Sequence, residues 1–299
     1  MPKLSIIILS YNTKDLTSDC LRSLIDQLKR SAHLESEIIV VDKGSADGSK
    51  EALNTSHLTL NTKHVVVNTI FNKENLGYPK GNNQGIKIAK GEYMLFLNSD
   101  VIVEDVDFDE VIRYMDKNKD IGALTVKVVL KAGGIDSASH RGFPSIWNAV
   151  CYFLKLELLF GRLPILNHIF GGYHLTYKDL NSIHEIDSPS GAFYLTRRDI
   201  LEKIGGFDES FFMYGEDLDL SFRIKESGYK IIYFPKSKVI HVKYASGLQT
   251  RDETIRKQTR GYFFEAMSIF YKKNYQDKYP SWIKTVVNVT ISIIKKMYV

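Results

Sequence analysis

Acidic, amide and hydroxyl side chains follow three apolar runs that have the composition of buried β-strands. In chain order these groups are Ser10, Tyr11 and Asn12 after residues 5–9, Asp42, Lys43, Gly44 and Ser45 after residues 37–41, and Asn98, Ser99 and Asp100 after residues 93–97. In an open α/β sheet, ligands bind beyond the carboxyl ends of the strands. We therefore expect the three groups to meet at one site of nucleotide size, and an enzyme is the leading interpretation.

The Asp42 carboxylate is suited to a nucleobase. It can accept a hydrogen bond from the imide N–H of a pyrimidine, and the small residues Gly44 and Ser45 allow the backbone to come close to a ligand. The alternative is an aspartate that only caps the following turn through its own backbone. The neighbouring group that begins at Ser10 favours the nucleobase.

Residues 75–85 form a glycine- and amide-rich loop that leads into a predicted helix. The N–H groups at a helix N-terminus can meet phosphate oxygens, and amide side chains can meet sugar hydroxyls. The candidate contacts are Asn75, Gly77 and Asn83. A plain turn would have the same composition. Lys80 adds a cation that could pair with phosphate or lie in solvent.

Asn98, Ser99 and Asp100 are placed where a hard divalent cation could bridge a diphosphate, because carboxylate and amide oxygens are its preferred ligands. One carboxylate is too few, so the site needs further ligands. His241, which closes the strand-like segment after Pro235, is a candidate. The alternative is a structural histidine, which is the commoner case.

Glu216, Asp217 and Asp219 concentrate three acids at the start of a predicted helix. Acids stabilise a helix N-terminus through capping and the helix dipole alone. The alternative is general-base catalysis, in which a carboxylate takes the proton of an acceptor hydroxyl as the hydroxyl attacks. Such a base typically contributes about 10²–10⁴-fold to the rate.

The elements that must position these side chains alternate along the first hundred residues. We expect strands at 4–9, 37–41, 64–68 and 93–97, and helices at about 14–30, 47–54 and 79–89. This order predicts right-handed βαβ units and a mostly parallel sheet with helices on both faces. Further along we expect a strand at 122–140 with a turn at Gly133, helices at 198–204 and 216–227, and a strand at 230–234. The apolar stretch 146–172 has no assignment.

The composition is that of a globular protein with a substantial core, since 44% of the 299 residues are hydrophobic. The formal charge is +5, and the basic excess lies after residue 250, where ten Lys and Arg outnumber four Asp and Glu. We expect no nucleic-acid partner.

Cys20 and Cys151 lack metal-ligand spacing and are interpreted as structural thiols. Without a signal-peptide pattern or a run of about 18 apolar residues, we expect a cytoplasmic protein, with the inner face of the cytoplasmic membrane as a second location.

Five ordered motifs between about residues 4 and 245 resemble the inverting family 2 glycosyltransferases of the GT-A fold, and within them the rhamnosyltransferase-like branch. The motifs are residues 5–12, 41–49, 75–85 and 97–101, and the series that runs from Ser190 through 205–208 and Glu216 to His241. The resemblance implies an α/β fold with a mixed, mostly parallel central sheet flanked by helices. It also implies a catalytic domain at 1–250, with a nucleotide-binding half at about 1–102 and an acceptor half at 103–250, and a basic helical extension at 251–299.

The resemblance implies a role for each motif residue. Tyr11 and Asp42 would contact the nucleobase, and Asn75 with its loop would approach the ribose and diphosphate. Asp217 would be the catalytic base with Glu216 beside it. Asp100 would bind Mg²⁺ or Mn²⁺, and His241 would complete the metal or diphosphate site. The other donor contacts would be Ser10, Asn12, Gly44, Gly77, Lys80, Asn83, Asn98 and Ser99, and the sugar and acceptor pocket would be lined by Ser190, Gly191 and Ala192.

Two residues depart from the family pattern. Lys43 stands where the family usually has Asn, and it would reach either phosphate or solvent. Asn98 stands where many members have a first Asp, which removes one charge from the metal site. Asp100 remains, so we expect dependence on magnesium or manganese.

The implied reaction is a single displacement that inverts the anomeric configuration. The donor would be a dTDP- or UDP-linked sugar, with L-rhamnose from dTDP-β-L-rhamnose as the best candidate, and the acceptor a glycan or a polyprenyl-linked sugar. Two other interpretations are a catalytically silent sugar-nucleotide-binding or scaffold protein and, less favoured, a nucleotidyltransferase. The second normally needs a basic, glycine-rich loop after the first strand, and residues 10–13 lack that character.

The end of the chain reads as an amphipathic helix. Ile283, Val286, Val287, Ile294 and Met297 are expected on one face, with lysines nearby. This face would pack on the catalytic domain or on a second copy in a homodimer, or it would bind an anionic leaflet as a peripheral membrane segment. The apolar stretch 146–166 offers the same alternatives.

Overall fold

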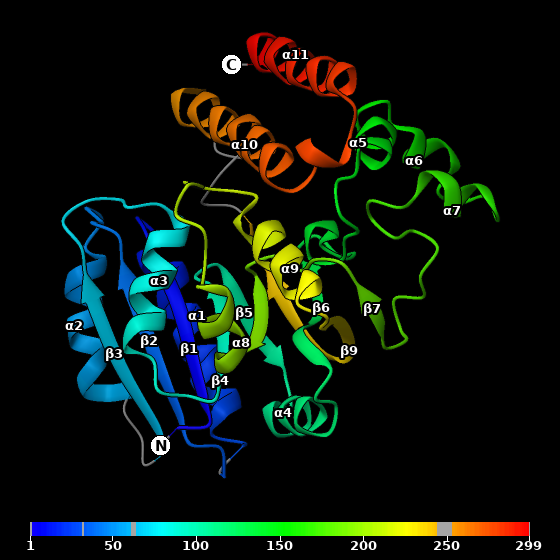
Figure 1. Cartoon of the computed structure of the whole chain (residues 1–299). Helices are drawn as coiled ribbons and strands as arrows, with labels where there is room; N and C mark the ends of the chain where they lie inside the picture. Colours follow the sequence, from blue (N-terminus) through cyan, green and yellow to red (C-terminus); the bar gives the residue numbers. More distant parts are fainter. Residues whose placement is uncertain (1, 32, 61–63, 244–252, 299) are drawn as a thin grey trace.

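The computed structural model describes residues 2–31, 33–60, 64–243 and 253–298. In these residues one nine-stranded sheet has the order β3-β2-β1-β4-β8-β6-β9-β5, with β7 paired to β9 (Figure 1). The strands are β1 (Leu4–Ser10), β2 (Ser36–Asp42), β3 (Val65–Phe71), β4 (Tyr93–Asn98), β5 (Val101–Asp105), β6 (Ile121–Leu130), β7 (His184–Ile186), β8 (Phe193–Arg197) and β9 (Lys230–His241).

The first four strands of the sheet are all parallel, as the sequence predicts. Their helices are α1 (Lys14–Leu28), α2 (Ser49–Leu60) and α3 (Tyr78–Ile88). Alternate side chains of β1 enter two cores, with Ile6 packed among residues of α1 and Ile7 packed on the opposite face. Because both faces are buried, these strands read as continuous apolar runs rather than as an alternating pattern.

The second half of the sheet is mixed. β8 runs antiparallel to both β4 and β6, whereas β6 and β9 are parallel. The strand predicted at 230–234 continues to His241, because Pro235 sits where the register with β6 shifts between Val126 and Lys127. A bulge of this kind tolerates a proline, which has no N–H to give to the ladder. The helices here are α4 (Phe108–Lys117), α8 (Arg198–Ile204) and α9 (Glu216–Glu226).

Residues 142–173 leave the sheet and form three short helices. These are α5 (Ile146–Phe153), α6 (Leu156–Phe160) and α7 (Leu166–Phe170). The hydroxyl of Ser145 caps α5 by accepting a hydrogen bond from the N–H of Asn148 at 3.1 Å. Both ends of this lobe meet, since the N–H of Gly142 donates to the carbonyl of Tyr173 at 2.8 Å. The unassigned stretch is therefore a lobe whose two ends lie together. We call the junction at Gly142 and Tyr173 the neck of the lobe.

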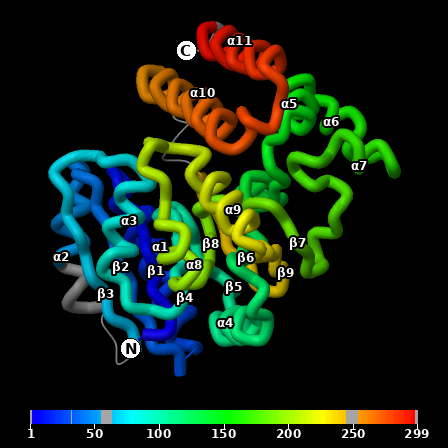
Figure 2. The backbone as a smooth tube through the Cα atoms, in the orientation of Figure 1, coloured from blue at the N-terminus to red at the C-terminus, as the bar shows by residue number. Residues whose placement is uncertain are grey.

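Two helices, α10 (Glu253–Asn274) and α11 (Ser281–Tyr298), complete the described chain. Figures 1 and 2 place both at the same end of the molecule as α5–α7, away from β1–β4. Phe270 and Tyr271 of α10 form a core cluster with Phe211 and with Leu218 of α9. The helical extension therefore packs on α9 and on the segment that precedes it. The predicted boundary between residues 250 and 251 lies outside the described residues.

Candidate active site

The parallel register brings the predicted nucleotide residues together. Ser10 pairs with Asp42, and Leu9 pairs with Asn98, so the three strand ends are level. Oδ1 of Asp42 accepts hydrogen bonds from the N–H groups of Gly44 at 3.1 Å and Ser45 at 3.0 Å. Oδ2 of Asp42 is buried and has no hydrogen-bond partner among the described residues. One oxygen thus caps the turn, and the other is left to accept a hydrogen bond from a ligand.

The loops after β1 and β2 are joined through Asn12. Its N–H donates to the Ser45 hydroxyl at 2.9 Å, and its Oδ1 accepts from the N–H of Ala46 at 2.8 Å. Tyr11 next to it is 41% exposed, so one ring face is open to stack on a base. Ser10, in contrast, is fully buried and bonds to Thr17 at 3.1 Å, which places its hydroxyl in the support of the loop.

Lys43 lies inside the site rather than in bulk solvent. Its Nζ is 5.8 Å from the centre of the Tyr11 ring. Burial lowers the pKa of Lys43 to about 8, against the opposing effect of the carboxylates of Glu216 and Asp42. The ammonium group of Lys43 lies near two carboxylates and could pair with a phosphate instead.

The loop before α3 approaches the segment before α9. Oδ1 of Asn75 accepts from the N–H of Gly77 at 3.0 Å, and Tyr78 N–H donates to the carbonyl of Phe212 at 2.8 Å. Gly77 has φ 86°, and a Cβ atom there would lie 2.6 Å from the same carbonyl. Only glycine is compatible with this close approach. The predicted donor loop is therefore in direct contact with the segment that precedes the acid motif.

Three predicted donor residues have other surroundings. Asn83 uses its amide to hold Phe207, donating to the carbonyl at 2.9 Å and accepting from the N–H at 3.0 Å. Lys80 is exposed on α3. Ser99 is buried, and its hydroxyl lies 3.2 Å from that of Thr13.

Asp100 and His241 come together because β5 pairs with the end of β9, with Val101 opposite His241. Nε2 of His241 lies 3.2 Å from Oδ1 of Asp100, and Nδ1 lies 2.7 Å from Oδ2 of Asp136. Burial lowers the pKa of His241, but hydrogen bonds to Asp100 and Asp136 outweigh it and raise the pKa to about 9. Lys243 pairs with the other Asp136 oxygen at 2.9 Å. The imidazole is thus fixed in orientation.

Asp136 was not predicted from the sequence. It is 1% exposed, and the hydrogen bonds of His241 and Lys243 lower its pKa despite the effect of burial. The available signal was an acid just after the turn at Gly133 and Gly134, at the end of a predicted strand.

Asp100 and His241 could hold a divalent ion that is shared with a ligand, provided that the ion displaces the proton that the imidazole holds towards Asp100. They supply one oxygen and one nitrogen, and the carboxylate of Asp136 on the far side of the imidazole is the usual outer partner of a metal-bound histidine. Within the described ranges no group of three or more His, Cys, Asp and Glu side chains is placed to hold a metal ion. The remaining coordination positions would go to diphosphate oxygens and water.

Asp217 lies in the first turn of α9 and pairs with an arginine that the sequence did not reveal. Oδ2 of Asp217 is 2.6 Å from Nη2 of Arg141, which also donates to the carbonyl of Pro189 at 3.0 Å. Burial lowers the pKa of Arg141, but the Asp217 carboxylate outweighs it, so the net pKa is raised. Oδ1 of Asp217 accepts from the N–H of Leu218 at 2.8 Å. The carboxylate is therefore held in one orientation.

Glu216 is the neighbouring acid, and its environment is different. It is 7% exposed, and in the part of the chain that the structure describes its Oε2 has no hydrogen-bond partner. Burial raises the pKa of Glu216 to about 8, and the charge of Asp217 adds to this effect. Burial thus favours the protonated form of Glu216, beside the arginine-paired carboxylate of Asp217.

Tyr78 connects the two ends of the site. Burial raises its pKa, and the charges of Glu216, Asp217 and Asp100 raise it further. A Cβ atom at Gly191 would collide with the Tyr78 hydroxyl and lie 3.4 Å from Oδ1 of Asn98. The Tyr78 hydroxyl thus lies against Gly191 of the predicted sugar pocket, and the charges of the predicted base and the predicted metal residue act on it. Ser190 and Ala192 are buried beside them.

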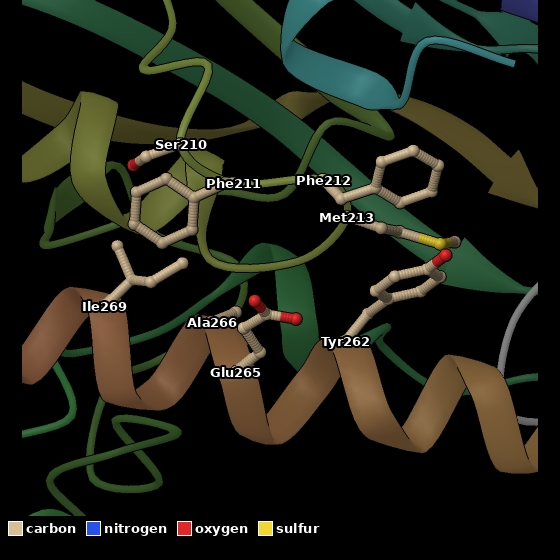
Figure 3. A pocket seen from close by; sticks show the side chains of 8 residues that line it. All are labelled: Ser210, Phe211, Phe212, Met213, Tyr262, Glu265, Ala266 and Ile269. Atoms are coloured by element: carbon tan, nitrogen blue, oxygen red, sulfur yellow. The ribbon is translucent and has the colours of Figure 1, made fainter.

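The segment before α9 is braced by α10. Figure 3 shows Phe211 above Ile269 of α10, with Phe212 and Met213 near Tyr262. The rings of Phe212 and Tyr262 are 4.5 Å apart between centroids. The small pocket between them is largely apolar and separate from the carboxylates described above. We interpret it as a packing gap that belongs to the support of α9.

Comparison with known proteins agrees with this arrangement. The family model described as Glycosyl transferase family 2 matches residues 5–205, which is more than half of the chain. The chain belongs to this glycosyltransferase family. A second model, described as Glycosyl transferase family group 2, matches residues 174–299. This glycosyltransferase is therefore an enzyme of the transferase class, as its motifs predict.

Relatives of this glycosyltransferase act in surface glycan synthesis. It is 27% identical over 255 residues to the O-antigen biosynthesis protein RfbC of Myxococcus xanthus, covering 82% of this chain and 18% of RfbC. It is 26% identical over 173 residues to the rhamnosyltransferase WbbL of Escherichia coli, covering 55% of this chain and 61% of WbbL. The chain thus spans less than two-thirds of either relative.

The fold of this glycosyltransferase is GT-A, which confirms the predicted fold class. It resembles a mannosyltransferase from Pyrobaculum calidifontis solved with GDP-Man and Mn²⁺, with a TM-score of 0.58 and 16% identity over 91% of this chain and 64% of that chain. It also resembles GalNAc-T7 solved with UDP, GalNAc and Mn²⁺, with a TM-score of 0.62 and 18% identity over 91% of this chain and 50% of that one.

Proposed function

We propose that this enzyme transfers a sugar from a nucleoside-diphosphate donor to a hydroxyl of a growing cell-surface glycan or a polyprenyl-linked acceptor, with inversion. The observation that supports this most is the surroundings of Tyr78, whose hydroxyl lies against Gly191 and which is acted on by the charges of Glu216, Asp217 and Asp100. A donor and an acceptor that meet near these groups would lie close to both the proposed base and the proposed metal residue. A polyprenyl-linked acceptor would place the reaction at the inner face of the cytoplasmic membrane.

We propose a pyrimidine donor, dTDP- or UDP-linked, because the unpartnered Oδ2 of Asp42 is an acceptor for an imide N–H. L-Rhamnose from dTDP-β-L-rhamnose is the proposed sugar. Two similarities support it: WbbL is a rhamnosyltransferase, and 54 residues are 44% identical to an N-acetylglucosaminyl-diphospho-decaprenol L-rhamnosyltransferase of Mycobacterium tuberculosis.

In the proposed mechanism Asp217 accepts the proton of the acceptor hydroxyl as its oxygen attacks the anomeric carbon, and the bond to the diphosphate breaks on the opposite face. Arg141 orients the carboxylate before the attack. Lys43 is near enough to the site to add a positive charge for the diphosphate. A divalent ion held by Asp100 and His241 would neutralise charge on the departing nucleotide.

A catalytically silent sugar-nucleotide-binding protein is the second candidate. The Arg141–Asp217 ion pair favours it, because a carboxylate that is already paired is a weaker base.

One experiment separates the two candidates. Dye-monitored unfolding with dTDP- and UDP-linked sugars, with and without Mn²⁺, identifies the donor, because a ligand that binds the native state raises its apparent stability. Release of nucleotide from the stabilising donor is then measured for the unmodified chain and for Asp217→Asn. We expect release to fall by about 10²-fold or more while donor binding persists. Donor binding without any turnover on the acceptors tested would favour the silent protein.

A further inference from the structure

The lobe α5–α7 exposes large apolar side chains to an unusual extent. Leu158 is 78% exposed, Ile165 76%, Leu159 66% and Leu154 64%, and Trp147 is 49% exposed. Single exposed apolar residues are ordinary on a protein surface, but five of them on one lobe of three short helices indicate an interaction site.

The outer face of α11 also exposes large apolar side chains. Trp282, Val286, Val289 and Ile293 follow one another at helical spacing and are 68%, 56%, 50% and 53% exposed. Val287 lies on the other face and packs on the cluster formed with α10. The predicted single apolar face, which grouped Val286 with Val287, is therefore wrong: α11 has one apolar face that packs and another that does not.

Within residues 146–170 and 281–298 the exposed charges are positive, although Asp277, just before α11, is exposed and pairs with Lys284 at 3.5 Å. Residues 146–170 contain a single acid, Glu157, which is buried and pairs with His174. The exposed charged residues of this stretch are Lys155 and Arg162. Residues 281–298 contain no acid, and Lys295 and Lys296 are exposed. A peripheral helix binds an anionic bilayer by burying apolar side chains in it and by placing cationic residues next to the lipid headgroups.

We propose that α5–α7 and the outer face of α11 together form a docking surface for an anionic lipid bilayer. Both elements lie at the same end of the molecule (Figures 1 and 2). A second copy of the chain is a poorer occupant, because an isologous interface would set identical basic residues near one another. None of the helices in the described residues is long and apolar enough to cross a membrane.

The neck of the lobe connects this docking surface to Asp217, the proposed catalytic base. Arg141, which pairs with Asp217, directly precedes Gly142, and the N–H of Gly142 bonds to Tyr173 at the other end of the lobe. A lobe that rests in the headgroup layer therefore begins next to the catalytic carboxylate. An acceptor carried by a lipid would meet the base at this neck. This last step rests on the proposed function, whereas bilayer binding itself does not.

The test is flotation of the full chain with vesicles, which reads binding without any activity. One set contains phosphatidylglycerol and phosphatidylethanolamine, and the other contains only phosphatidylcholine. We expect flotation with the anionic set that weakens as salt is raised. The variants Leu158→Glu with Ile165→Glu, and Val286→Glu with Ile293→Glu, should each weaken it at least about tenfold, since each pair loses the burial of two large apolar side chains.

A matched control is Val66→Glu, which places the same charge on a residue that is 50% exposed on β3, far from the lobe. It should float like the unmodified chain. Thermal unfolding checks that every variant is folded. The proposal is overturned if the unmodified chain does not bind anionic vesicles, or if both double variants bind as the control does. It is also overturned if the same substitutions abolish a dimer seen by sedimentation, because a second copy is then the occupant. Nucleotide release by the double variants should be unchanged, so failure of the proposed function would be visible separately.

Discussion

Nη2 of Arg141 lies 2.6 Å from Oδ2 of Asp217, and both side chains are buried. The pair joins the neck of the α5–α7 lobe to the first turn of α9. Removing one partner of a buried ion pair leaves an uncompensated charge, which is costly. The arginine thus serves two purposes in the proposed enzyme: it supports the fold locally, and it orients the carboxylate that would receive the acceptor proton.

Arg141→Met should therefore destabilise the protein by about 3–5 kcal/mol, because Asp217 would be left buried and unpaired. Arg141→Lys should cost less, since it keeps the charge, but it cannot donate to Asp217 and Pro189 in the same geometry. Chemical unfolding of both variants measures the difference. Arg22, which is exposed, supplies the control Arg22→Met, and an equal effect there would contradict the interpretation.

The Asp42→Asn variant tests the nucleobase contact. An asparagine Oδ1 can keep the hydrogen bonds to Gly44 and Ser45, whereas Oδ2 becomes an NH₂ donor. Affinity for UDP or dTDP should fall by about 10–100-fold, because the imide N–H loses its acceptor. Affinity for CDP should fall less or rise, since cytosine offers an acceptor at the same position. Calorimetric titration with the three nucleotides measures these changes, and equal losses for all three would contradict the assignment.

The metal site is tested through nucleotide-dependent stabilisation. Asp100→Asn and His241→Gln should each abolish the part of the thermal shift that needs Mn²⁺ together with a nucleoside diphosphate. Asp136→Asn should weaken the apparent Mn²⁺ affinity by about 10–100-fold, because it removes the outer partner of the imidazole. The control Asp105→Asn, at the exposed end of β5, should behave as the unmodified chain. An Mn²⁺ response that survives in Asp100→Asn would exclude this site.

The raised pKa of Glu216 predicts that the stability of the protein depends on pH. Its pKa is raised to about 8 by burial and by Asp217, so between the unfolded and folded pKa values the native state holds one more proton than the unfolded chain. Stability should therefore fall as pH rises from about 4.5 to about 8, and this contribution should be constant above that range. Glu216→Gln should flatten the decline of the unfolding temperature across the same window. Glu226→Gln, at an exposed end of α9, should leave the decline unchanged.

The side chains around the nucleotide pocket could be predicted to a useful extent. Asp42 and Asn98 each end a buried strand, so their position in space follows from the register of a parallel sheet. Asn83 shows the limit of this reasoning. Its loop composition indicates a ligand contact, but its amide holds Phe207, which lies 124 residues away in the chain. A local pattern identifies polar residues and does not say which of them another segment will use.

By itself, the sequence determined the βαβ half of the protein and the order of its acidic motifs. It also determined that Asp100 and Asp217 belong to one family pattern. Each of these depends only on apolar strand runs and on short spacings along the chain. Only the tertiary structure decided the partners Arg141 and Asp136, which are 76 and 105 residues from the side chains that they hold. It also decided that α5–α7 and one face of α11 stay uncovered. The physical reason is that such contacts depend on how separate elements pack, and hydrophobicity along the chain does not record which apolar face finds a neighbour.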